Sequence, residues 1–243
     1  MVQLARTGFG PQHNFRKSNA PVECVVQSEL ATVSALVNLD SEIELNNKCH
    51  YLPHGPIIKL NSQTTKVRPV FDGSASQRGK LSLNKCLHKG INLLEMIPGI
   101  LDRFRMFPIG ISADIEKAFL MLSVAPKDRD LLRFFFPGSE GQEIYRHCRV
   151  VFGVCSSPYL LNISLIHLLE NCPTEFKEIA QKMKRSFYVD SLVCGVYNTS
   201  ELEHFIEQAK CIMNKGFFLT CVVLKATLIV KMLTSIQEVP QFC

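Results

Sequence analysis

Two aspartates stand where apolar segments end, and they are the strongest candidates for chemistry in this sequence. Asp114 closes the apolar segment 109–113, and Asp190 lies inside residues 186–195, which have a strand, turn and strand pattern. An ionised carboxylate in such surroundings is costly unless a cation pairs with it, and a divalent metal ion is a common strong partner. A sheet that places the two strands side by side would bring the carboxylates together at one metal site.

Two neighbouring carboxylates suit a pair of Mg²⁺ or Mn²⁺ ions. Two such ions about 4 Å apart activate an attacking hydroxyl and neutralise a leaving oxygen, as in-line nucleotidyl transfer requires. Lys66 and Arg68 fall on one face of an expected strand, because strand side chains alternate. An arginine grips phosphate oxygens in bidentate fashion, so this pair is a candidate to hold a triphosphate.

Each of these residues also has a commoner structural explanation. An aspartate at a strand end usually forms a turn, and basic side chains on a strand usually face solvent. Phe119 is by default a core aromatic residue, and Gly153 by default supplies a backbone turn. It is the order of these residues along the chain that favours the catalytic interpretation.

Strands and helices alternate around the candidate residues. We expect a β-hairpin over 57–72 with its turn at 61–65, then a helix over 90–107 that is interrupted at Pro98-Gly99. A strand over 109–113 and a helix from Glu116 follow. Paired strands at 131–136 and 144–151 come next, and a further helix begins at 156–158. This order predicts an α+β fold with helices on one face of an antiparallel sheet.

Two further helices are expected. Residues 201–215 carry an apolar stripe, with a capping box at Ser200 and Glu203 and a stop at Gly216. Residues 28–39 fit one amphipathic helix.

Composition narrows the class of protein. With 243 residues and 47% hydrophobic content the chain can bury a sizeable core, and the net charge of +5 is compatible with a polyanionic partner. No run approaches the roughly 18 apolar residues of a membrane span, and no signal-peptide pattern opens the chain, so we expect no membrane partner and a cytoplasmic or nuclear location. The cysteines lack zinc-site spacing, which favours reduced thiols.

The run of motifs resembles the reverse transcriptase domain of Bel/Pao-type long-terminal-repeat retrotransposons over about residues 51–218. The matching stretches are YLPH at 51–54, KVRPVFDGSA at 66–75, ADIEKAF at 113–119, FGVCSSP at 152–158 and YVD at 188–190. The resemblance implies a reverse-transcriptase-like arrangement of fingers and palm, with an antiparallel palm sheet.

The resemblance also implies an RNA-directed DNA polymerase working by two-metal nucleotidyl transfer. Asp114 and Asp190 would be the catalytic, metal-binding carboxylates, with the Ile115 carbonyl as a further ligand of the two Mg²⁺ or Mn²⁺ ions. The implied partners are an RNA or DNA template-primer and deoxynucleoside triphosphates.

Five other residues receive nucleotide-binding roles from the resemblance. Arg68 and Lys66 would contact the incoming triphosphate, and Phe119 would exclude a ribose 2′-hydroxyl. Gly153 and Ser157 would help to shape the nucleotide and template pocket.

The resemblance divides the chain into four parts. Residues 1–45 form an N-terminal extension of unassigned function, 46–108 a fingers-like part, 109–219 a palm-like part and 220–243 a divergent tail. The missing continuation after the palm indicates a fragment of a longer element.

Ser191 departs from the motif, which usually has a second aspartate at this position. A neutral hydroxyl gives the site one fewer anion, so we expect truncation and Ser191 to impair activity. Two alternatives stay open: a catalytically inactive retroelement relic or co-opted nucleic-acid-binding module, and an unrelated metal-dependent nuclease.

Overall fold

The computed structural model describes residues 36–39, 49–58, 67–138, 141–217 and 219–225. The chain divides into two compact units. The first comprises residues 1–90 and 119–160, and the second comprises 91–118 and 161–243. The predicted turn at 61–65 lies outside the described residues.

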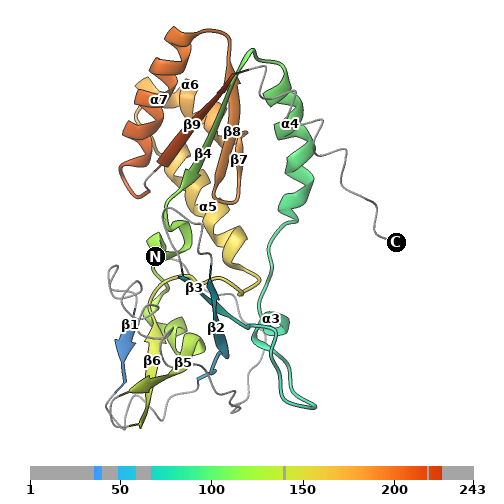
Figure 1. Cartoon of the computed structure of the whole chain (residues 1–243), viewed down its shortest axis with the longest axis vertical. Coiled ribbons are helices and arrows are strands. Elements are labelled where there is room, and N and C mark those ends of the chain that lie inside the picture. The colour runs from blue at the N-terminus through green and yellow to red at the C-terminus, as the bar shows by residue number, and fades with distance from the viewer. Residues whose placement is uncertain (1–35, 40–48, 59–66, 139–140, 218, 226–243) are drawn as a thin grey trace. The chain divides into compact units, whose positions relative to one another are not determined.

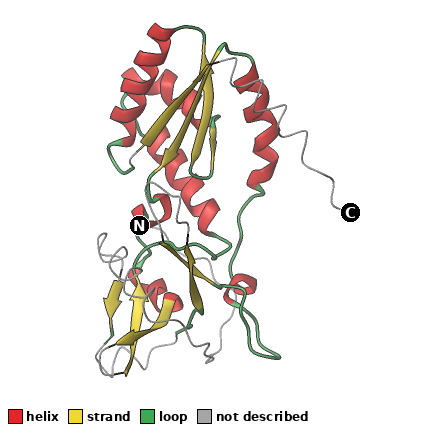
Figure 2. Ribbon diagram, in the orientation of Figure 1, coloured by secondary structure: helices red, strands yellow, loops and turns green. Residues whose placement is uncertain are grey.

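Two small antiparallel sheets form the first unit (Figures 1 and 2). One has the order β1-β6-β5, made of Leu36–Asn38, Gly141–His147 and Arg133–Gly138. The other pairs β2 (His54–Ile58) with β3 (Val67–Phe71). Both predicted strand pairs are therefore confirmed. The short helix α3 (Leu83–Cys86) and the 3₁₀ turn Pro126–Leu132 also belong to this unit, as does the 3₁₀ turn Ala118–Met121 except for its first residue.

A four-stranded antiparallel sheet with the order β7-β8-β4-β9 forms the centre of the second unit. Its strands are Phe187–Tyr188, Ser191–Val196, Ile109–Ile115 and Leu219–Lys225. The unit also contains the helices α4 (Ile97–Arg105), α6 (Lys177–Lys184) and α7 (Thr199–Met213), with 3₁₀ turns at Leu93–Met96 and Thr174–Phe176. Helix α5 (Ser157–Glu170) begins in the first unit and ends in the second.

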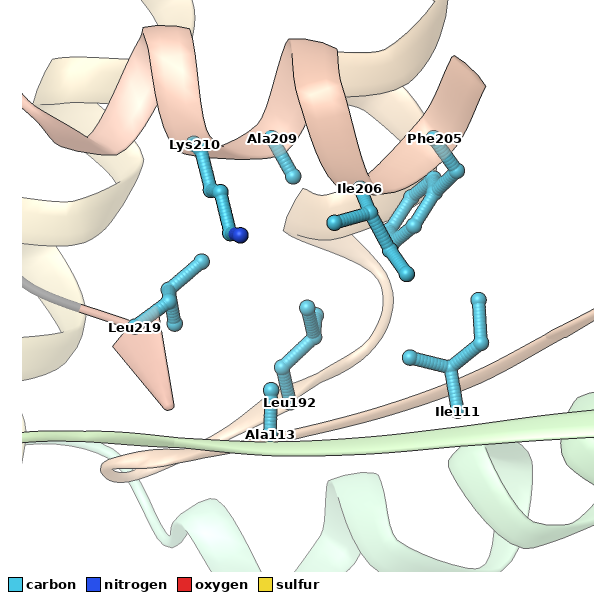
Figure 3. Close-up of a pocket in the computed structure, with 8 residues that line it drawn as sticks. All are labelled: Ile111, Ala113, Leu192, Phe205, Ile206, Ala209, Lys210 and Leu219. Atoms are coloured by element: carbon cyan, nitrogen blue, oxygen red, sulfur yellow. The ribbon is translucent and has the colours of Figure 1, made fainter. Parts of the chain in front are cut away.

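Alternation along the central strand β4 decides which way its side chains face. Ile111, Ala113 and Ile115 are buried, whereas Ser112 is half-buried and Asp114 is exposed. Figure 3 shows α7 packed over the apolar side of this sheet. The narrow hollow between them is lined by Ile111, Ala113, Leu192, Phe205, Ile206, Ala209, Lys210 and Leu219. Asp114 therefore points to the side of β4 opposite the apolar core.

The capping box of α7 differs from the predicted one. The Asn198 side chain accepts a hydrogen bond from the Glu201 N–H at 2.9 Å, and Glu201 in turn accepts from the Asn198 side chain at 3.1 Å and from the Tyr197 N–H at 3.0 Å. The predicted box at Ser200 and Glu203 is thus wrong by two residues. The helix is confirmed, but it runs from Thr199 to Met213.

Two other helix predictions need correction. Pro98 lies in the first turn of α4, where its missing N–H removes no helical bond, so the proline opens this helix and does not interrupt it. The helix expected from Glu116 is only the 3₁₀ turn Ala118–Met121. Helix α5, by contrast, begins at Ser157 as its serine and proline predicted.

Corrections also arise toward both ends of the described chain. Residues 36–38 form strand β1, so the helix predicted over 28–39 is wrong there, and its earlier part lies outside the described residues. Strand β9, which pairs with β4 along its whole length, was not predicted. Helix α6 was not predicted either. Within the part of the chain that the structure describes, no helix has the length and apolar character needed to cross a bilayer.

A buried histidine lies in the aromatic core of the first unit. The ring centroid of His147 is 5.4 Å from that of Phe71 and 6.2 Å from that of Phe134. Burial is the main cause that lowers the pKa of His147 to about 3, and the Arg149 charge adds to this shift. His147 is therefore neutral in the folded protein at neutral pH.

Stability is expected to fall in acid because of His147. Below its ordinary pKa of 6.5 the unfolded chain binds a proton, which the folded chain accepts only near pH 3. Between pH 7 and pH 4.5 this group should remove about 2 to 3 kcal/mol from the free energy of unfolding. Urea titrations at both pH values measure the loss.

A His147→Leu variant, which has no titrating ring, is the control for this acid effect. It should lose less stability between the two pH values than the wild type. Burial also lowers the pKa values of His50 and His54, so the variant keeps part of the loss. Equal losses in the two proteins would assign the acid sensitivity to other groups.

Candidate active site

The structure places Asp114 in strand β4 of the second unit and Asp190 in the turn that leads into the neighbouring strand β8. Asp114 in β4 is paired with Ser191, the first residue of β8. The Ile115 N–H donates a hydrogen bond of 2.9 Å to the Asp190 carbonyl, which fixes the backbone of Asp190 beside β4. Residues directly opposite on paired strands have Cβ atoms about 5 Å apart, which places Asp114 beside Ser191. Asp190 is the residue before Ser191, so the two aspartates lie near the same end of β4 and β8.

Asp190 stands in a tight hairpin turn. Tyr188 pairs with Ser191, which leaves Val189 and Asp190 as a two-residue loop and confirms the predicted strand, turn and strand. Val189 has a φ of 55°, in the left-handed region that β-branched residues rarely adopt. Two-residue hairpin loops require a positive φ, and the residue at that position is usually glycine or asparagine. Strain of this kind, held by the flanking strands, is typical of functional sites.

The chemistry of the donor set fits a hard divalent cation. Two carboxylates and the backbone carbonyl of Ile115 offer oxygen ligands, and Mg²⁺ is typically held by one or two carboxylates with further oxygens from substrate phosphates. In the described ranges, no group of three or more His, Cys, Asp or Glu side chains could hold a metal ion. Among the residues that the structure describes, this site therefore offers two aspartates and no larger cluster of such ligands. The Ser191 hydroxyl, which lies opposite Asp114, donates a 2.8 Å hydrogen bond to Asp114 Oδ1.

Gly153 makes a close backbone crossing in the first unit. Its φ is 91°, and a Cβ at this position would lie 1.7 Å from the Phe71 carbonyl oxygen. The Phe71 N–H donates to the Phe152 carbonyl at 3.3 Å. Only glycine fits where this loop passes the end of β3.

Asn84 was missed by the sequence analysis, although it organises the same loop. Its side-chain amide donates to the Gly153 carbonyl at 3.0 Å and to the Ser74 hydroxyl at 2.9 Å. Its side-chain oxygen accepts from the Cys155 N–H at 2.8 Å. These bonds join segments far apart in sequence, so no local spacing marks Asn84.

Phe119 and Ser157 are both buried within the first unit. The Phe119 ring packs edge-on against Phe152, with centroids 4.6 Å apart, and Phe152 is 38% exposed. The Ser157 hydroxyl donates to the Val151 carbonyl at 2.7 Å, which anchors the start of α5. Phe152 therefore presents the solvent-exposed surface of this aromatic pair.

The two predicted phosphate-binding residues are less fully placed. Arg68 lies in β3 opposite Ile57, but its side chain is outside what the structure describes. Lys66 lies outside the described residues. Their expected common face therefore stays a prediction.

Comparison with solved structures shows the fold. A structure of the foamy viral protease-reverse transcriptase dRH in complex with double-stranded DNA matches with a TM-score of 0.66 and 18% identity, over 98% of this chain and 41% of that chain. A selenomethionine-labelled mutant of the prototype foamy virus protease-reverse transcriptase matches with a TM-score of 0.60 and 19% identity, over 86% of this chain and 24% of that chain. The native form of that protein matches with a TM-score of 0.59 and 17% identity, over 90% of this chain and 25% of that chain. The chain thus spans less than half the length of these relatives, and the likeness confirms the predicted α+β, reverse-transcriptase-like fold.

Comparison of sequences identifies the family. No curated protein sequence matches the chain. A family model described as reverse transcriptase (RNA-dependent DNA polymerase) matches residues 59–225, which include Asp114, Asp190 and all of β9. The match extends beyond Leu219, where the sequence motifs had faded. Because it covers more than half of the sequence, the chain belongs to the reverse transcriptase (RNA-dependent DNA polymerase) family.

Proposed function

We propose that this chain is the RNA-directed DNA polymerase domain of a Bel/Pao-type long-terminal-repeat retrotransposon. The observation that carries the proposal is the pairing of β4 with β8 within the family match, in which Asp114 lies opposite Ser191, the residue after Asp190. The Bel/Pao assignment rests on the ordered sequence motifs. Its partners would be a template-primer and deoxynucleoside triphosphates.

In this proposal, Asp114, Asp190 and the Ile115 carbonyl hold two Mg²⁺ or Mn²⁺ ions. When bound, such ions activate the primer 3′-hydroxyl and neutralise the leaving oxygen of an in-line displacement. The protein's own contribution is to hold its carboxylates in place before substrate arrives. The hydrogen bond from the Ile115 N–H to the Asp190 carbonyl supports that role.

The remaining candidate residues would bind and select the nucleotide. Arg68 and Lys66 hold the triphosphate, and Phe119, whose ring packs against the more exposed Phe152, excludes a ribose 2′-hydroxyl. Gly153 shapes the pocket loop, and Ser157 supports that loop through its bond to the Val151 carbonyl. Residues 46–108 act as fingers and 109–219 as palm.

Primer extension tests the proposal directly. The purified 243-residue chain should extend a DNA primer on an RNA template in Mg²⁺ or Mn²⁺, and chelation by EDTA should stop the reaction. Extension that persists in EDTA would contradict the metal-dependent mechanism. Cleavage of a labelled duplex without nucleotides would instead indicate the nuclease alternative.

A second candidate function is nucleic-acid binding without catalysis. Ser191 favours it, because the site then has two carboxylates for two divalent ions. A basic segment, residues 78–89, favours binding in either case. It contains no Asp or Glu, and it exposes Arg78, Lys80, Lys85, His88 and Lys89.

Neutralising this basic segment should weaken nucleic-acid binding and its salt dependence. The variant changes four exposed cations to glutamine: Arg78, Lys80, Lys85 and Lys89. Each lost phosphate contact lowers the slope of log affinity against log salt by about 0.7 for single strands, so the slope should fall by about two to three. Fluorescence anisotropy with labelled single-stranded RNA over a range of salt concentrations measures it.

A charge-matched variant in the second unit is the control for this binding experiment. It changes four other exposed cations to glutamine: Lys177, Arg185, Lys210 and Lys215. This variant should keep the wild-type slope to within about one. Equal losses in the two variants would mean that overall charge, and not residues 78–89, governs binding.

A further inference from the structure

Ser191 and Asp114 form a side-chain pair at the edge of the palm-like sheet. Ser191 opens β8, Asp114 is its partner in β4, and the hydroxyl donates to Asp114 Oδ1 at 2.8 Å. Asp114 is exposed and Ser191 is half-buried. The bond therefore holds Asp114 Oδ1 from the facing strand.

A hydroxyl at this place does what a carboxylate cannot do. Serine can donate a hydrogen bond, whereas an ionised aspartate only accepts. An aspartate at 191 would also put two like charges directly opposite each other on paired strands, which is destabilising until a cation binds between them. With Ser191, the carboxylate of Asp114 has a partner before any metal ion arrives.

We infer that Ser191 is a positioning residue for Asp114. Compared with an aspartate at 191, it lowers the affinity of the site for metal ions and makes the metal-free protein more stable. This inference rests on the proposed function, since it assumes that Asp114 holds a divalent ion. The hydroxyl orients Oδ1 by donating to it, which steadies the whole carboxylate for coordination. The missing negative charge makes the ions bind more weakly than they would beside an aspartate at 191.

Mn²⁺ binding to the full chain, followed by the electron paramagnetic resonance signal of free Mn²⁺, tests the orienting role. Ser191→Ala removes the donor and should weaken binding about tenfold, at the low end for the loss of a partner that orients a ligand. Ser191→Thr keeps a hydroxyl and suits a strand, so it should bind within about threefold of the wild type. Wild-type affinity in Ser191→Ala would overturn the orienting role.

A thermal melt of Ser191→Asp tests whether Ser191 stabilises the metal-free protein at the cost of weaker metal binding. In EDTA this variant should melt below the wild type because of the opposed carboxylates, and in Mn²⁺ its melting temperature should rise by more than that of the wild type. A Ser191→Asp protein that melts at or above the wild-type temperature in EDTA would overturn this stabilising role.

An Asp114→Asn control separates failure of this inference from failure of the proposed function. Its amide keeps an oxygen that accepts from Ser191 but loses the negative charge. If Mn²⁺ binding survives this change, the proposed metal site itself is wrong. If binding is lost in Asp114→Asn yet unchanged in Ser191→Ala, the metal site stands and only the role of Ser191 falls.

Discussion

Asp114→Asn should reduce Mg²⁺-dependent primer extension by at least about 1,000-fold, which corresponds to about 4 kcal/mol of lost transition-state stabilisation. The amide has nearly the size of the carboxylate and can still accept from Ser191, whose bond to Asp114 Oδ1 is 2.8 Å long. It carries no charge, however, and so holds a divalent cation poorly. Single-turnover extension rates, measured with saturating nucleotide, isolate this effect.

The matched control for this variant is Asp102→Asn. Asp102 is an exposed aspartate of α4 in the same unit, and its carboxylate pairs with Arg105 at 3.9 Å on the surface. A surface pair of this kind contributes little to stability, so extension should stay within about twofold of the wild type. Equal rates in Asp114→Asn and the wild type would remove Asp114 from the chemistry, whatever the fold.

Local sequence signals were enough to predict the elements that carry the two aspartates. The apolar segment before Asp114 became β4, and the apolar flanks of Asp190 became the β7–β8 hairpin. Both signals are local: a strand is marked by its own residues, and a two-residue turn fixes the register of its hairpin. The side-by-side placement of β4 and β8 came only from the resemblance to a family and from the assumption of one sheet.

Pairing between distant segments could not be predicted in the same way. Strand β9 is recognisable as a strand of this sheet only through its register with β4, from Ile109 opposite Lys225 to Ile115 opposite Leu219. Asn84 is similar, because its partners Gly153 and Cys155 lie in a loop about 70 residues away. A polar residue whose hydrogen-bond partners are distant in sequence produces no periodic pattern by which it could be recognised.

The start of α7 shows a different limit. Asn198 with Glu201 and Ser200 with Glu203 have the same spacing, so the sequence contains two overlapping capping boxes. The structure uses the first, and the Tyr197 N–H adds a third bond to Glu201. The local sequence predicts the helix, but it does not decide between the two possible first residues.

Gly153→Ala should destabilise the protein by at least about 3 kcal/mol, because two costs coincide at this position. The φ of 91° is unfavourable for any residue with a Cβ, and the added carbon would lie 1.7 Å from the Phe71 carbonyl oxygen. Relief of that overlap must move backbone, since Phe71 is buried and its N–H is bonded to the Phe152 carbonyl. Urea unfolding followed by circular dichroism measures the loss.

Gly79→Ala separates the two costs, because Gly79 has a similar φ of 79° but no atom within 4 Å of its would-be Cβ. This control should lose only about 1 kcal/mol, which is the backbone cost of a left-handed alanine. The difference between the stability losses of the two variants then measures how closely the loop at Gly153 is packed against the end of β3. Similar losses in both would mean that the loop can withdraw from Phe71, and a loop that withdraws so easily could not hold the shape of a nucleotide pocket.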